Sequence, residues 1–297
     1  MKVLNFGSLN IDHVYNVDHL VQPGETIASD SLEVFLGGKG FNQSIALARA
    51  GCKVFHAGMI GKDGEQLIQV LNNEGVDTEN IRVSDSKTGQ AIIQVDKLGQ
   101  NSIIIYGGAN QDVKKEFIDH VLENFSEGDI ILLQNEISNI DYIMEEAKKK
   151  DMHIMFNPSP IDENISLLPL KNVTWFILNE LEGMSITGEK DNAKVAWSML
   201  KMFPNAKIIL TLGNRGALYV DKDESHSFGV YDIEIKDTTG AGDTFAGFFL
   251  ASVIEGNSIP ISLQRASVAS ALAISEKGAS DSIPTKEKVE LHNLILK

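Results

Sequence analysis

The chain has 297 residues, of which 43% are hydrophobic and 23% charged, proportions that are ordinary for a globular protein. Its formal net charge of −15 argues against a nucleic-acid groove or an anionic membrane as the binding partner. The single cysteine, Cys52, excludes an internal disulfide, and no apolar stretch approaches the ~20 residues that span a bilayer, so we expect a cytoplasmic protein.

Short β-rich runs alternate with amphipathic helices along most of the chain. We predict strands at 3–7, 54–59, 129–134, 153–157, 174–178 and 207–211, with a further strand-like run at 231–236. Helices are predicted at 41–50, 64–74 and 139–150, within 193–203, and as three helices covering most of 244–296. This order predicts a three-layer α/β/α fold, with a mostly parallel central sheet covered by helices on both faces.

Two regions break the alternation and contain no obvious helix. Residues 13–36 hold short alternating runs, and residues 90–106 are typical of a hairpin, with strands at 90–96 and 102–106. No repeat or linker separates either region from the rest. We therefore predict a single domain over 1–297, with a small β-sheet lid built from these two insertions.

The first polar motif leaves the first strand as Gly7-Ser-Leu-Asn10-Ile-Asp12. The period of two places the side chains of Asn10 and Asp12 on the same side if the chain remains extended. An Asn/Asp pair can then bond vicinal hydroxyl groups, although both residue types are also common in turns.

A glycine-rich loop, residues 37–44, follows at a loop-to-helix boundary. Its glycines allow close approach of a ligand, and Lys39 and Asn42 supply hydrogen-bond donors. A polyhydroxylated ligand needs such groups, because an unmet buried polar group costs about 1–3 kcal/mol.

Two further motifs follow predicted strands. Asn179 either caps the next helix or lies with Glu182 near phosphates and a hydrated magnesium ion. The glycine turn at 211–216 stands at the carboxyl end of its strand, where open α/β sheets bind ligands. The glycine-rich loop, the Asn179 motif, the turn at 211–216 and the turn at Gly240 described below are therefore all expected at that edge of the sheet.

The most informative segment is Asp237-Thr-Thr-Gly240-Ala-Gly-Asp243-Thr-Phe-Ala-Gly247. This segment follows a strand-like run, contains three glycines and leads into an apolar helix. Such a pattern indicates a helix N-terminus whose amides hold an anion, and Asp243 could accept a proton there. An aspartate at this place is also a common helix cap. A dinucleotide site is disfavoured because Phe245 replaces the third glycine of that fingerprint. A P-loop is absent from the sequence.

Taken together, these motifs resemble the ribokinase family of sugar kinases, over essentially the whole chain and in order. The resemblance is carried by the segments beginning at Gly7, Pro23, Gly37, Gly107, Asn179, Thr211 and Gly240. It implies transfer of the ATP γ-phosphoryl group to the terminal hydroxymethyl group of a pentose, D-ribose. It also implies a homodimer formed through the lid.

The resemblance further implies residue roles. Asp243 is the base, with amides of Gly240, Ala241, Gly242 and Asp243 holding the developing charge. The sugar site comprises Asn10, Asp12, Gly38, Lys39, Asn42 and Glu136. The ATP site comprises Asn179, Thr211, Gly213, Asn214, Arg215, Gly216, Gly242 and Ser267, with Glu182 holding Mg²⁺ through water. A monovalent cation, K⁺, is assigned to Asp237, Thr239, Ala273, Glu276, Gly278 and Ser282.

Three residues depart from the family pattern. Phe41 and Ala246 replace a usual Ala and a usual Asn, and Glu276 is unusual in the cation segment. Because Phe41 adjoins the sugar loop, a kinase for 2-deoxyribose or for another sugar or nucleoside stays open as an alternative. A catalytically silent sugar- or nucleotide-binding protein is the alternative from another class. It is disfavoured, because a binding protein has no use for a base at Asp243.

Overall fold

The computed structural model describes residues 1–297 and contains a nine-stranded sheet in the order β13-β12-β11-β10-β9-β8-β1-β4-β5. Seven strands run parallel: β1 (Val3–Phe6), β4 (Val54–Ile60), β5 (Asp77–Val83), β8 (Ile130–Gln134), β9 (His153–Asn157), β10 (Trp175–Asn179) and β11 (Lys207–Thr211). At one edge, β12 (Ala217–Val220) and β13 (Ser225–Phe228) pair in the antiparallel sense. The predicted mostly parallel sheet is confirmed.

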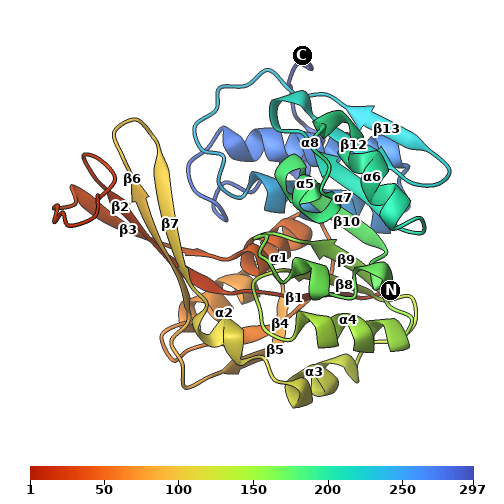
Figure 1. Ribbon diagram of the computed structural model, residues 1–297, viewed down its shortest axis with the longest axis horizontal. Helices are drawn as coiled ribbons and strands as arrows, with labels where there is room; N and C mark the ends of the chain where they lie inside the picture. The colour runs from red at the N-terminus through yellow and green to blue at the C-terminus, as the bar shows by residue number, and fades with distance from the viewer.

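Helices cover both faces of this sheet, as predicted (Figure 1). One face packs against α1 (Lys39–Arg49), α2 (Glu65–Asn73), α7 (Ala241–Ile254), α8 (Ile259–Ile274) and α9 (Lys286–Glu290). The other packs against α3 (Lys115–Leu122), α4 (Ile140–Lys149), α5 (Glu180–Thr187) and α6 (Val195–Met202).

The central strands bury both of their faces. In β8, Ile130 and Leu132 belong to the apolar cluster under α1 and α7, whereas Ile131 and Leu133 belong to the cluster under α3 and α4. Strands buried on both faces read as continuous apolar runs, which is why β8 was recognisable in the sequence.

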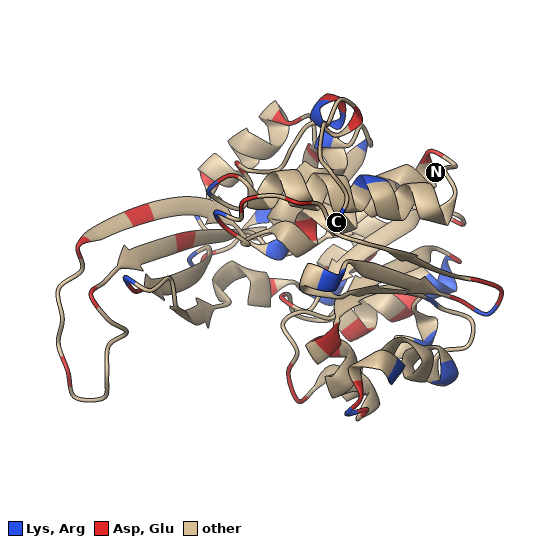
Figure 2. Cartoon of the chain, turned by 90° about the horizontal axis from the view of Figure 1, so that it is seen from above, with Lys and Arg blue, Asp and Glu red and all other residues tan.

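A second sheet has the order β3-β2-β6-β7. Its strands are β2 (Asn10–Asn16), β3 (Ser31–Gly37), β6 (Gly89–Val95) and β7 (Asn101–Tyr106), and it projects from the main body in both views (Figures 1 and 2). β6 and β7 form the predicted antiparallel hairpin. The two insertions therefore do come together in one small sheet, which also includes Asn10 and Asp12.

Some elements differ from prediction. The run 231–236 is not a strand, since the sheet ends at β13 and the run does not pair with it. Tyr231 makes only an isolated bridge to Leu296. The helix predicted from about residue 244 begins at Ala241, which places Asp243 inside its first turn. Several short elements were missed, including β5, α3, β12 and β13; α3, for example, begins without a side-chain cap. No helix has the length and apolar character needed to cross a membrane.

Candidate active site

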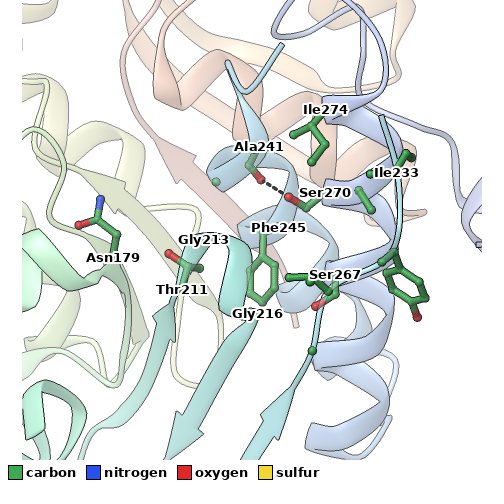
Figure 3. A pocket seen from close by; sticks show the side chains of 15 residues that line it. Asn179, Thr211, Gly213, Gly216, Ile233, Ala241, Phe245, Ser267, Ser270 and Ile274 are labelled. Atoms are coloured by element: carbon green, nitrogen blue, oxygen red, sulfur yellow. Dashed lines mark hydrogen bonds between the residues drawn. The ribbon is translucent and has the colours of Figure 1, made fainter. Parts of the chain in front are cut away.

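The predicted site residues gather where the carboxyl ends of β1, β8, β10 and β11 meet the N-terminal ends of α1 and α7. A polar cavity of about 180 Å³ is lined by Lys39, Asn179, Glu182, Gly242 and Asp243, among others. A second cavity of about 270 Å³ adjoins it, because Asn179, Thr211 and Gly242 line both (Figure 3). Asp243 lines the polar cavity, and its neighbour Gly242 lines both cavities.

The Asp243 carboxylate is buried and held by two consecutive residues of α1. Nδ2 of Asn42 donates to its Oδ2 at 3.0 Å, and Nε2 of Gln43 donates to its Oδ1 at 2.8 Å. Burial raises the pKa of Asp243, while Lys39 and these two hydrogen bonds oppose the rise. The result is a fixed carboxylate whose proton affinity is increased, as a general base requires.

Lys39 is the cation of the site. Its Nζ lies 4.0 Å from Oε1 of Glu136. Burial opposes its charge, but the carboxylates of Asp243, Glu136, Glu182 and Asp12 raise the pKa of Lys39. Lys39 therefore stays protonated, and its ammonium group is the local positive charge that an anionic ligand needs in a chain of net charge −15.

Glu136 follows β8 and bridges two loops. Its Oε2 accepts hydrogen bonds from the Ser8 hydroxyl and, at 3.1 Å, from the backbone amide of Lys39. Burial raises the pKa of Glu136 against the influence of Lys39 and Ser8. The carboxylate thus connects the β1–β2 turn to the glycine loop.

Asn10 and Asp12 extend from β2, as the period of two predicts. Oδ1 of Asn10 accepts a hydrogen bond from Nδ2 of Asn110 at 2.7 Å, so Asn110 fixes its amide. Oδ1 of Asp12 is buried with no hydrogen-bond partner. Burial, followed by the charge of Glu136, raises the pKa of Asp12 to about 7. An unpartnered buried acceptor is suited to a ligand hydroxyl group.

The glycines of the loop 37–40 have a packing role that the sequence analysis did not predict. A Cβ on Gly40 would lie 2.4 Å from the backbone nitrogen of Ser8, and one on Gly38 would lie 3.1 Å from its carbonyl oxygen. Gly38 also has φ +96°, which favours glycine. These glycines are therefore needed for close packing against the chain after β1, in addition to any contact with a ligand.

The first turn of α7 presents backbone amides to both cavities. Gly240 has φ +73° and precedes the helix, and a Cβ on Gly242 would meet no atom within 4 Å. The amides of Gly242 and Asp243 lack an i−4 partner within the helix, while that of Ala241 donates to the Thr238 carbonyl at 3.3 Å. This turn fits an anion, with Gly242 and Asp243 as the best-placed donors.

The structure confirms the capping expectation for Asn179 and Glu182. They form a reciprocal capping box at the start of α5, in which Oδ1 of Asn179 accepts from the Glu182 amide at 2.9 Å. Both oxygens of Glu182 accept from Asn179, and both residues line the polar cavity. Each carboxylate oxygen has a second lone pair, so capping leaves capacity for a hydrated metal ion.

The larger cavity contains most, but not all, of the predicted nucleotide residues (Figure 3). Thr211, Gly213, Gly216, Gly242 and Ser267 line it. Asn214 and Arg215 do not, and Arg215 instead pairs with Glu180 on the exposed surface. Sequence reasoning missed the apolar part of the lining: Val230, Tyr231, Ile233, Phe245, Ala271 and Ile274. The run 231–236 was an available signal, but it was interpreted as a strand.

The residues assigned to a cation lie on two adjacent loops. Oδ2 of Asp237 accepts from the Gly278 amide at 3.0 Å, and its Oδ1 accepts from Thr239. These hydrogen bonds, against the effect of burial, hold the pKa of Asp237 below its usual value. Ala273 is buried at the end of α8, and the Ser282 hydroxyl donates to the Ala279 carbonyl at 3.0 Å. The Glu276 side chain points to solvent beside Lys236, so only its backbone fits a cation role.

Comparison with known proteins gives consistent matches along the chain. A family model described as pfkB family carbohydrate kinase matches residues 1–286. A ribokinase from Haemophilus influenzae is 33% identical over 291 residues, covering 95% of each chain. The structure of a ribokinase from Cryptococcus neoformans in complex with ADP aligns with a TM-score of 0.86 at 34% identity, covering 97% of this chain and 98% of that one. An Arabidopsis thaliana ribokinase complexed with ribose and ATP aligns with a TM-score of 0.87 at 27% identity, covering 97% of both.

Proposed function

This chain belongs to the pfkB family of carbohydrate kinases, and we propose that it uses ATP to phosphorylate D-ribose at its terminal hydroxymethyl group, giving ribose 5-phosphate and ADP. The observation that carries the proposal is the position of Asp243. Its buried carboxylate lies in the first turn of α7 and lines the polar cavity, and the preceding residue, Gly242, lines both that cavity and the larger one. The ribokinase relatives point to ribose and ATP as the two ligands.

The reaction follows from this position. The Asp243 carboxylate takes the proton of the sugar hydroxyl while that oxygen forms a bond to the γ-phosphorus of ATP. The bond between the γ-phosphorus and the β–γ bridging oxygen breaks, and ADP leaves. The amides of Gly242 and Asp243, with the ammonium of Lys39, stabilise the negative charge on the transferring group.

We place the sugar next to Lys39 and Asp243, which line the polar cavity. Asp12 and Asn42 do not line that cavity, but their Oδ1 atoms are buried without a partner and suit hydroxyl groups as acceptors. Phe41, the departure that left the sugar open, is fully buried in the apolar cluster under α1 and α7. Its ring therefore fills core volume, which supports ribose over a reshaped pocket.

Two ions belong to the same proposal. Glu182 would hold Mg²⁺ through water, and the ion would neutralise charge on the ATP phosphates. K⁺ would be held beside the anion site by carbonyls of the loops at Asp237, Thr239, Ala273, Glu276, Gly278 and Ser282, which Asp237 joins. Its charge would strengthen the local field at the first turn of α7.

The small sheet is proposed to act as a lid and as a dimer contact. On β7, Ile103, Ile104, Ile105 and Tyr106 are each more than half exposed, and on β3 Leu32 is 50% and Val34 54% exposed. Consecutive exposed apolar residues on an edge strand favour pairing with another surface. β6 and β7 carry no charged residue. A cytoplasmic location is part of the same proposal.

The deciding experiment measures ADP release from Mg-ATP over D-ribose, 2-deoxyribose, fructose and nucleosides, with and without potassium. We expect strong turnover with ribose that potassium increases. A site built to bond a hydroxyl rejects the analogue that lacks it, so 2-deoxyribose should react much more slowly. Preference for another acceptor would keep the kinase chemistry and refute the sugar assignment, and absence of turnover with every acceptor would favour the binding-protein alternative.

A further inference from the structure

Below Asp243, five polar side chains are buried in a layer that is otherwise apolar. They are Asn5, Gln43, Ser44, His56 and Gln134, and none is more than 1% exposed. Burying polar groups is costly unless they bond to one another, so such a cluster within a core calls for an explanation.

Strand register brings the cluster together. Asn5 of β1 lies opposite His56 of β4, and opposite Leu132 of β8, two residues before Gln134. The period of two therefore places Asn5, His56 and Gln134 on one face of three adjacent strands. That face is the one covered by α1, which contributes Gln43 and Ser44.

The five side chains form one hydrogen-bonded chain that ends on Asp243. Nε2 of Gln134 donates to Oε1 of Gln43 at 2.7 Å and to Oδ1 of Asn5 at 2.9 Å. Gln43 then donates to Asp243 at 2.8 Å. At the other end, Nδ2 of Asn5 donates to the Ser44 hydroxyl at 2.8 Å, and that hydroxyl bonds Nδ1 of His56 at 2.7 Å.

The donor and acceptor directions along these hydrogen bonds allow only one orientation of each side-chain amide. An ionised carboxylate only accepts, so Gln43 must present its NH₂ group to Asp243 and its Oε1 to Gln134. Gln134 must then present NH₂, which requires an oxygen from Asn5. Nδ2 of Asn5 is in turn anchored on the Gly40 carbonyl at 2.7 Å, at the start of α1.

We infer that Gln134 and Asn5 are positioning residues that fix the Gln43 amide and, through it, the orientation of the Asp243 carboxylate for proton transfer. The inference rests on the proposed role of Asp243 as the base. Reversing the Gln43 amide would place its oxygen against the carboxylate and leave buried groups unpaired, at about 1–3 kcal/mol for each group.

Other charges near Asp243 must be considered in any pH measurement. Lys39 on α1, Glu136 after β8, Glu182 on α5 and Asp12 on β2 all belong to the same electrostatic cluster. His56 is the last member of the hydrogen-bonded series, and burial lowers its pKa to about 4. His56 is therefore neutral near pH 7, and the five-residue chain contributes no charge there.

The test uses Gln134→Met, Gln43→Met and the double variant. Gln134→Met should lower kcat by about 10-fold or more, with KM for ribose and ATP within about twofold. The pKa of Asp243, read from its carboxyl ¹³C shift, should rise because a bond that favours the charged form is weakened. Since Gln134 acts through Gln43, the double variant should be no slower than Gln43→Met.

A matched control is Ser262→Ala. It removes a buried hydrogen bond of 3.0 Å between the Ser262 and Ser252 hydroxyls, away from the site. It should leave the Asp243 pKa unchanged. An unchanged kcat and pKa in Gln134→Met, or losses that multiply in the double variant, would overturn the inference. If Gln134→Met fails to fold, Gln134→Leu also removes the donor without adding a charge, with the same expected direction. The NMR readout needs no substrate, so failure of the kinase proposal is distinguishable from failure of this one.

Discussion

Asn42 and Asp243, which are 201 positions apart in the sequence, form a hydrogen bond of 3.0 Å that uses only the NH₂ group of the Asn42 amide. Its Nδ2 donates to Asp243, whereas its Oδ1 is buried with no partner. One side chain can therefore hold the proposed base and also accept a hydrogen bond from a sugar hydroxyl. In the proposed reaction, this arrangement would bring the reacting hydroxyl close to Asp243.

Replacing Asp243 with Asn tests the base directly. The change keeps size and removes the proton acceptor, so we expect kcat to fall by roughly 10²–10⁴-fold while ADP still binds. Steady-state kinetics and calorimetric titration of ADP give the two quantities. Near-normal turnover would eliminate Asp243 as the base.

Asp12 should make ribose binding depend on pH. Its pKa of about 7 means that the acceptor carboxylate is lost as pH falls through 7, so KM for ribose should rise toward lower pH, by up to about tenfold per unit. Asp12→Asn should raise KM and remove this dependence. A profile of KM with no inflection near pH 7 in the unmodified protein would contradict the prediction.

Asp12 should also make stability depend on pH. Low pH should weaken ribose binding but stabilise the folded protein. A folded pKa of about 7 lies above the model value of 3.8, so the native state binds more protons than the unfolded state between these values. The free energy of unfolding should therefore decrease as pH rises from about 4 to 7. Asp12→Asn should increase stability at pH 8 by on the order of 1–4 kcal/mol, measured by urea denaturation.

Asp237 should control activation by potassium. Its carboxylate ties Thr239 to Gly278, so Asp237→Asn loses one of these bonds and should reduce potassium activation at least severalfold. Glu276→Gln is the matched control, because the Glu276 side chain is 67% exposed and pairs with Lys236. Equal activation curves for Asp237→Asn and the unmodified protein would refute the cation assignment.

Two glycines of α7 should respond to alanine in different ways. A Cβ on Gly247 would lie 2.4 Å from Cβ of Ala46, so Gly247→Ala should separate α1 from α7 and cost about 1–3 kcal/mol of stability. Gly242 has open space, so Gly242→Ala should fold normally but raise KM for ATP by intruding on the cavity. Thermal denaturation and ATP kinetics separate the two effects, and the reverse pattern would contradict this account.

Much of the fold was predictable because its signals are local. Apolar runs such as 129–134 and the glycine turn before α7 report backbone preferences that act over a few residues. Edge elements such as β13 were not predictable, since a polar strand with one partner has no such pattern. The run 231–236 has a strand's alternation without a neighbouring strand, and pairing cannot be read from one segment.

The sequence by itself determined the order of the elements, the glycine turns and the polar residues at the carboxyl edge of the sheet. Only the tertiary structure decided that Asn42 and Gln43 hold Asp243, that Arg215 pairs with Glu180 outside the cavity, and that Gln134 reaches Gln43. The physical reason is the sequence separation over which each interaction acts. Local conformation follows from a few consecutive residues, whereas these contacts depend on strand register and helix packing between segments far apart in the chain.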